Sequence, residues 1–199
     1  MTQVSYSEAD YTWVLEEDSE KREQEYLKII NSYTKEEQAL FPKMIASVVN
    51  SLSIEKYNDV LGTLFEELGL HNKFKGQFFT PNDVSYLIAE INSIYVEEIK
   101  DDIKNYGYFK LNDCACGSGR LFYSYLKMMK ENNIDYNSQV FIEAQDISSV
   151  CVYMTYIQLS LYGVCAKVIH GDTLLNEIYD VFYTPMTIKY PFRFRDELK

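Results

Sequence analysis

The sequence has little that is typical of a membrane or exported protein. Its 199 residues include no apolar run that approaches the length of a membrane span. The first 19 residues are acidic and lack the apolar segment of a secretory signal. These absences argue against a membrane protein and predict a cytoplasmic one.

Metal-ligating residues are also scarce. The chain has four cysteines and two histidines. Cys114 and Cys116 form a C-x-C pair, but no second pair follows at the spacing of a metal site, so we expect no metal. In a cytoplasmic protein the thiols are expected to stay reduced.

Basic residues are outnumbered throughout. The formal net charge is −11, and the first hundred residues hold 9 basic against 18 acidic side chains. An isolated duplex-DNA binder normally has a basic face, because phosphate contacts supply most of its affinity. We therefore expect no strong DNA binding by the chain alone. The acidic N-terminal helices are interpreted as a surface for a protein partner, as a DNA mimic or as an ordinary solvated surface.

The apolar residues that are present predict a sizeable core with two kinds of pattern. Hydrophobic residues make up 47% of the chain. Residues 16–32, 34–52 and 57–68 have helical patterns, and from residue 80 onward helices and strands alternate. Alternation of this kind is typical of an α/β fold with a parallel sheet. We predict an N-terminal helical region over residues 1–75 and an α/β domain over residues 76–199.

A glycine-rich turn between a strand and a helix is the most informative local feature. Residues 108–111 alternate as a short strand and residues 120–129 read as an amphipathic helix. Between them Gly117 and Gly119 can adopt positive φ and let a ligand approach the backbone at the start of the helix. Such a turn indicates nucleotide binding, although a purely structural turn explains the pattern equally well by itself.

Four segments of the chain resemble one enzyme family. Residues 113–119 (DCACGSG) resemble the first motif, D-P-A-C-G-S-G, of the adenine-specific (N6) DNA methyltransferases, especially the modification subunits of type I restriction–modification systems. Residues 76–81 (GQFFTP), 145–148 (QDIS) and 171–174 (GDTL) resemble further motifs in the family order. The resemblance implies a Rossmann-like core that binds S-adenosylmethionine (SAM), preceded here by an N-terminal helical layer.

The same resemblance implies which residues bind SAM. Segment 79–81 would contact the methionine end, the glycine-rich turn would lie beneath the methionine and ribose, Asp146 would bind the ribose, and Asp172 the adenine. The expected cofactor-binding residues are Phe79, Thr80, Pro81, Asp113, Ala115, Gly117, Gly119, Asp146, Ile147 and Asp172.

Local sequence patterns allow some of these residues to be interpreted independently of the resemblance. Asp146 follows an apolar strand, where a carboxylate can accept hydrogen bonds from both ribose hydroxyls. It lies 33 residues after Asp113, farther than the roughly 20 of a dinucleotide fingerprint, which argues against an NAD site. Thr80, Pro81 and Asp83 can instead be a helix start, with the threonine hydroxyl as N-cap.

One motif of the family is missing. Members of the family hold the flipped adenine with an Asn/Asp-Pro-Pro-Tyr/Phe tetrapeptide, which is the missing motif. This chain has four prolines and no two are adjacent. Phe182, Tyr183 and Pro185 remain the candidates for a base pocket, without the carboxamide or carboxylate. Because the chain ends at Lys199, before the family's later strands, we expect a domain truncated at its C-terminus.

Three functions therefore stay open. The first is a SAM-dependent DNA adenine N6-methyltransferase domain of the restriction–modification type, which reaches DNA through a partner specificity or methyltransferase subunit. The second is an inactive SAM-binding module with a regulatory, partner-binding or DNA-mimicking role. The third is a methyltransferase for another substrate.

Overall fold

The computed structural model describes residues 12–70 and 79–190 together with Phe194 and Glu197. The chain divides into two compact units, residues 1–47 and residues 48–199. The boundary that the sequence predicts after residue 75 thus lies within the second unit.

The first unit consists of helices. It contains α1 (Thr12–Ile30), α2 (Lys35–Gln38) and the first half of α3 (Phe41–Ile54). A capping box opens α2, because the Glu37 backbone N–H donates to Thr34 Oγ1 over 3.3 Å and the Thr34 N–H donates to Glu37 Oε2 over 2.8 Å. The single helix expected over residues 34–52 is interrupted. Pro42 lacks an N–H and occupies the first turn of α3, which explains why a new helix begins there.

A four-stranded sheet in the order β1-β2-β3-β4 organises the second unit. The strands are β1 (Phe109–Asp113), β2 (Val140–Asp146), β3 (Cys165–Asp172) and β4 (Glu177–Tyr183). The first three strands are parallel, as the sequence predicts, whereas β4 is antiparallel to β3. Residues 173–176 are too few for a helical crossover, so the chain turns back and β4 pairs with the strand that it follows.

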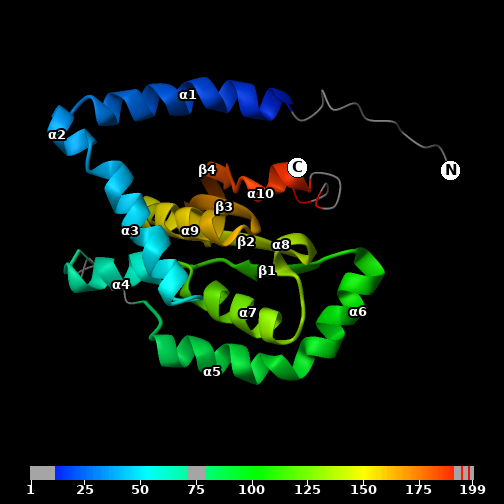
Figure 1. The fold of residues 1–199 in the computed structure, drawn as a ribbon. Coiled ribbons are helices and arrows are strands. Elements are labelled where there is room, and N and C mark those ends of the chain that lie inside the picture. The colour runs from blue at the N-terminus through cyan, green and yellow to red at the C-terminus, as the bar shows by residue number, and fades with distance from the viewer. Residues whose placement is uncertain (1–11, 71–78, 191–193, 195–196, 198–199) are drawn as a thin grey trace. The chain divides into compact units, whose positions relative to one another are not determined.

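Helices join the parallel strands and lie on one face of the sheet (Figure 1). The crossover from β1 to β2 contains α7, and the crossover from β2 to β3 contains α9. The helices of this unit, besides the second half of α3, are α4 (Val60–Glu67), α5 (Asn82–Asn92), the short 3-10 helix η3 (Ser93–Tyr95), α6 (Val96–Tyr106), α7 (Arg120–Glu131), α8 (Tyr136–Gln139), α9 (Ser149–Tyr162) and α10 (Met186–Lys189).

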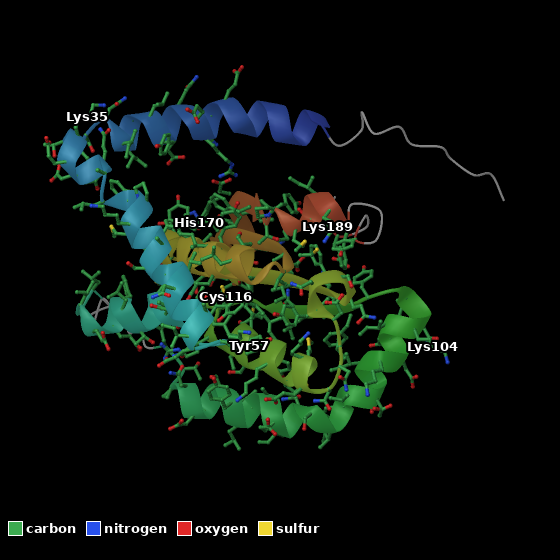
Figure 2. All side chains as sticks on the ribbon, viewed as in Figure 1. Lys35, Tyr57, Lys104, Cys116, His170 and Lys189 are labelled. Carbon is green, nitrogen blue, oxygen red and sulfur yellow. The ribbon has the colours of Figure 1, made fainter. Side chains whose placement is uncertain are left out.

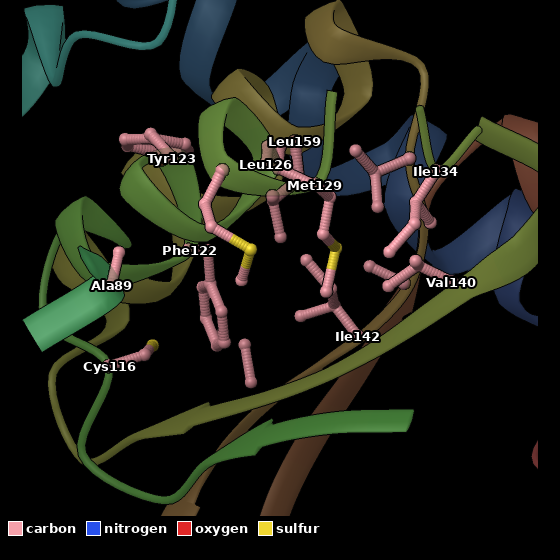
Figure 3. Close-up of a cluster of buried hydrophobic side chains, with 14 of the residues drawn as sticks. Ala89, Cys116, Phe122, Tyr123, Leu126, Met129, Ile134, Val140, Ile142 and Leu159 are labelled. Carbon is pink, nitrogen blue, oxygen red and sulfur yellow. The ribbon is translucent and has the colours of Figure 1, made fainter. Parts of the chain in front are cut away.

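The main core lies between these helices and the sheet (Figure 3). Phe122, Leu126 and Met129 of α7 are fully buried against Val140 and Ile142 of β2. Their spacing on α7 is the apolar stripe that the sequence shows over residues 120–129. This packing fixes the direction in which α7 leaves the glycine-rich turn.

The opposite face of the sheet is more polar. Lys110 Nζ of β1 contacts Glu143 Oε2 of β2 at 3.2 Å and Glu197 Oε2 at 2.7 Å. Beside this charged group, Phe194 packs with Phe141 and Cys165 in a small second apolar cluster. Parallel sheets are normally covered on both faces. Within the described residues, by contrast, this face of the sheet is covered only in part.

Neither a membrane span nor a metal cluster is found in the part of the chain that the structure describes. None of its helices is both long and apolar enough to cross a bilayer. No three of its His, Cys, Asp and Glu side chains gather as metal ligands, and Cys116 and His170 lie on different elements (Figure 2).

Candidate functional site

Three aspartates end the three parallel strands at the same edge of the sheet. Asp113 is the last residue of β1, Asp146 of β2 and Asp172 of β3. Parallel strands bring their carboxyl ends together, and this edge is where open α/β sheets bind ligands. The three acids singled out in the sequence therefore surround one region.

Asp146 holds the glycine-rich turn with its carboxylate. The Gly117 N–H donates to Asp146 Oδ2 over 2.9 Å and the Ser148 N–H donates to Oδ1 over 2.8 Å. The Cys116 N–H donates to the Gln145 carbonyl over 2.9 Å and joins the same two segments. Each carboxylate oxygen keeps acceptor capacity for a ligand hydroxyl after these bonds. The acid at the end of β2 is thus fixed beside the turn that follows β1.

The turn itself needs glycine at two positions. Gly117 has φ 57° and Gly119 has φ 88°, values that L-amino acids with a side chain rarely adopt. A Cβ at Gly117 would lie 3.1 Å from the Phe79 ring, and a Cβ at Gly119 would lie 2.6 Å from the Tyr123 hydroxyl. Phe79 therefore lies directly against the turn.

A small cavity of about 60 Å³ lies where these segments meet. Residues 79 and 80 form one of its walls, and Asp113, the glycine-rich turn and the start of α7 form the others. The lining residues are Phe79, Thr80, Asp113, Ala115, Cys116, Gly117, Ser118, Arg120 and Leu121. The structure thus brings together five of the ten predicted cofactor residues in one cavity.

The other predicted cofactor residues border this region. Pro81 is the N-cap of α5 and Gly119 the N-cap of α7. α5 begins at Asn82 and its N-cap makes no side-chain hydrogen bond, so the predicted threonine cap is wrong. Ile147 is 59% exposed beyond the end of β2.

Backbone N–H groups hold the remaining aspartates. Asp113 Oδ1 accepts from the Ala115 N–H over 3.0 Å, and Asp172 Oδ1 accepts from the Leu174 N–H over 2.8 Å. The Thr173 hydroxyl donates to the Cys114 carbonyl over 2.7 Å and ties the end of β3 to the turn after β1. The three strand ends therefore form one connected edge.

The candidates for a base pocket lie elsewhere. Because β4 runs antiparallel to β3, Tyr183 pairs with Lys167 near the start of β3, whereas Asp172 pairs with Glu177. Phe182 packs on Tyr153 and Tyr156 of α9, with ring centroids 5.6 Å apart in both pairs. Pro185 follows at the start of α10. Tyr183 and Pro185 thus lie toward the start of β3, away from the three aspartates, whereas Phe182 pairs with Val168 in the middle of that strand.

A buried network behind the cavity was missed from the sequence. Asp59, the N-cap of α4, is 1% exposed and accepts from four groups. Its partners are the Gly62 N–H (2.8 Å), Arg120 Nε (2.9 Å), Gln158 Nε2 (3.0 Å) and the Ser118 hydroxyl. We call Asp59, Ser118, Arg120 and Gln158 the Asp59 network. An aspartate directly before an apolar helix was its one visible signal.

The two cysteines beside the site are poor nucleophiles. Burial raises the pKa of Cys116 well above its usual value, and the charge of Asp146 adds to the effect. Burial, followed by the charge of Asp146, raises the pKa of Cys151 to about 11. Neither thiol is ionised at neutral pH, so these two buried side chains add no nucleophile to the region.

Comparison with known proteins agrees with this geometry. The family described as N-6 DNA methylase matches residues 56–189, which include the Asp59 network, the glycine-rich turn and all three aspartates. The chain belongs to this family. Its members generally use SAM as the methyl donor.

One curated relative extends the comparison. The methylase subunit of the type I restriction enzyme MjaIX from Methanocaldococcus jannaschii is 29% identical over 141 residues. The match covers 68% of this chain and 22% of the relative, so the chain spans only about a fifth of that protein. No solved structure matches the chain.

The residues at the edge of the sheet fit part of SAM. The turn leaves no room for a Cβ beneath Phe79, and the Asp146 carboxylate is pre-oriented by two backbone N–H groups. Such a cradle suits the amino-acid and ribose portions of a nucleoside ligand. The cavity of about 60 Å³ encloses only a small group, so the rest of a cofactor would lie along the open strand ends.

Proposed function

We propose that this chain is the cofactor-binding part of a DNA adenine N6-methyltransferase of the restriction–modification type and acts in the cytoplasm. The observation that carries the proposal is the bond between Asp146 and the Gly117 N–H, because it fixes the ribose acid beside the glycine-rich turn. When bound, SAM supplies a methyl group that its sulfonium has already activated.

Each segment of the edge has a separate task in this proposal. Phe79, Thr80 and Pro81 bind the amino-acid end of SAM, and Asp113, Ala115 and the turn at Gly117 and Gly119 lie beneath its methionine and ribose portions. Asp146 and Ile147 hold the ribose, and Asp172 accepts from the adenine amine. The acids are oriented before the ligand arrives, since backbone N–H groups already hold Asp113, Asp146 and Asp172.

In this proposal the chain binds SAM by itself, and a partner chain completes the site for methyl transfer. In a doubly wound sheet the ligand crevice lies beside strand 1, between it and strand 4. Here β1 is an edge strand, and among the described residues no strand lies on its outer side. The net charge of −11 also favours delivery to DNA by a specificity or methyltransferase subunit. The acidic N-terminal helices are a further surface for a protein partner.

Calorimetric titration with SAM tests the cofactor site. We expect saturable binding by the wild-type chain and affinity at least about tenfold weaker for Asp146→Asn, since a neutral amide accepts hydrogen bonds less strongly. Asp101→Ala, which changes an exposed acid on α6, is the matched control and should bind as the wild type does. Absence of wild-type binding at millimolar SAM would overturn the proposal.

A second candidate is favoured by one observation. The sequence has no adjacent prolines, and Tyr183 pairs with Lys167 near the start of β3, away from Asp172 at its end. These facts support a catalytically silent SAM-binding module that regulates a partner. Transfer of a labelled methyl group to adenine-containing DNA, measured with and without an intact methyltransferase subunit, separates the two functions. A silent module binds SAM and yields no labelled DNA in the absence of the partner.

A further inference from the structure

Arg120 is the first residue of α7 and is 7% exposed, which is unusual for a charged side chain. Each of its three nitrogens donates to a different residue, and Nη2 also lies 3.5 Å from Thr63 Oγ1. Nε donates to Asp59 Oδ2 over 2.9 Å, Nη1 donates to the Thr80 carbonyl over 2.9 Å, and Nη2 donates to Glu66 Oε2 over 3.1 Å. The side chain therefore links α4, α7 and the segment before α5.

The side of Arg120 that faces Asp59 is rigid. The Asp59 carboxylate also accepts from the Gly62 N–H of α4, the Gln158 amide of α9 and the Ser118 hydroxyl of the turn. A buried charge pair with its other acceptor sites filled is held in one geometry. Arg120 is thus anchored to a framework that includes the glycine-rich turn itself.

The other side of Arg120 holds the wall of the cavity. Arg120 Nη1 donates to the Thr80 carbonyl, and Arg120 Cζ lies 5.9 Å from the centre of the Phe79 ring. Phe79 and Thr80 line the cavity opposite Gly117. Arg120 reaches Asp59 and the Thr80 carbonyl with two different nitrogens of one planar group, whereas a lysine has its three donors on a single nitrogen and cannot reproduce that spacing.

We propose that Arg120, anchored by Asp59, is a positioning residue that fixes the Phe79–Thr80 segment against the glycine-rich turn and thereby sets the affinity for the amino-acid end of SAM. This inference rests on the proposed function. The carboxylates of Asp146 and Asp172, which are assigned to the nucleoside, accept from backbone N–H groups of the turn and loops and not from Arg120. Binding of the nucleoside alone is therefore independent of Arg120.

Two ligands separate positioning from general damage to the fold. Calorimetry would compare SAM with methylthioadenosine, which keeps the nucleoside and lacks the amino-acid end. For Arg120→Lys we expect affinity for SAM to fall about tenfold or more and affinity for methylthioadenosine to stay within about threefold of wild type. Lys127→Met is the matched control, because Lys127 is another cation of α7 that contacts α5, through the Tyr86 ring at 4.6 Å. It should leave both affinities unchanged.

Equal losses for both ligands in Arg120→Lys, or no loss for either, would overturn the inference. Hydrogen–deuterium exchange of the peptide over residues 79–88 adds a measurement without ligand, and exchange should become faster in Arg120→Lys and stay unchanged in Lys127→Met. If wild-type protein binds neither ligand while exchange still accelerates, the proposed function fails and Arg120 remains the residue that holds the segment. Unchanged exchange overturns the positioning role itself.

Discussion

At the scale of single residues, the candidate site depends on groups that are held before any ligand binds. The carboxylates of Asp113, Asp146 and Asp172 all accept from backbone N–H groups of the loops that follow their strands. Bonds of this kind cost little entropy on ligand binding, because both partners are already ordered. The nearby thiols of Cys116 and Cys151 differ from these acids, because burial raises their pKa values and keeps them protonated.

Selective labelling of cysteine tests this description. Cys114 is exposed, whereas Cys116, Cys151 and Cys165 are buried. Because burial and Asp146 raise the pKa of both Cys116 and Cys151, we expect maleimide at pH 7.5 to modify native protein rapidly at Cys114 alone. Mass spectrometry of the labelled protein measures the number of modified thiols. Rapid modification that persists in Cys114→Ser would contradict the buried placement of the other three.

At the scale of elements, α4 packs against the glycine-rich turn through a glycine, Gly62. Gly62 lies in the first turn of α4, and its N–H donates to Asp59 Oδ1 over 2.8 Å. A Cβ there would lie 2.7 Å from Asp59 Cγ and would also collide with the Ser118 hydroxyl. The glycine is required by this close approach, since its own φ lies outside the left-handed region.

Gly62→Ala should therefore destabilise the protein, although alanine favours helices by up to about 1 kcal/mol over glycine. Overlap with the buried Asp59 carboxylate displaces its hydrogen bonds, and we expect a net loss of about 1–3 kcal/mol in the free energy of unfolding. Urea denaturation followed by circular dichroism measures the change. Gly69→Ala is a useful comparison, because a Cβ there meets nothing within 4 Å and only the backbone, at φ 66°, is strained. Equal or greater stability of Gly62→Ala would contradict the close packing.

Elements that depend on nearby residues were predicted well from the sequence. The strand, turn and helix around residues 113–119 are local, and so is the apolar stripe of α7. The Asp59 network was missed because its members are distant in sequence, with Ser118 lying 59 positions and Gln158 lying 99 positions away. The direction of β4 was missed because alternation predicts a strand without its orientation, and the short connection after β3 was the usable signal.

At the scale of the whole molecule, ion pairs on the polar face of the sheet make the free energy of unfolding depend on pH. Lys110 of β1 contacts Glu143 of β2 and Glu197 of the C-terminal segment. Burial alone would raise the pKa of Glu197, but hydrogen bonds from Lys110 and Tyr108 outweigh it and lower the pKa below 4.5. The ionised carboxylate is thus the form that the folded protein stabilises.

The contribution of Glu197 should depend on pH in a defined direction. Because the folded state lowers the pKa of Glu197, its stabilisation is complete above pH 4.5 and is lost as the pH falls through the folded-state pKa. We expect Glu197→Gln to lower the free energy of unfolding by about 1 kcal/mol at pH 7 and by much less near pH 3. Urea denaturation at both pH values measures the difference. A deficit that is the same at both would contradict the charged contact.

The shared carboxylate of Asp59 also limits how the chain can diverge during evolution. Replacing Asp59 leaves the buried cation Arg120 with only the partly exposed carboxylate of Glu66, and replacing Arg120 leaves a buried anion. A side chain at Gly62 is tolerated only after the carboxylate has gone. These three positions therefore depend on one another, so we expect descendants to keep all three or to change them together, whereas each exposed acid of α6 can be replaced by itself.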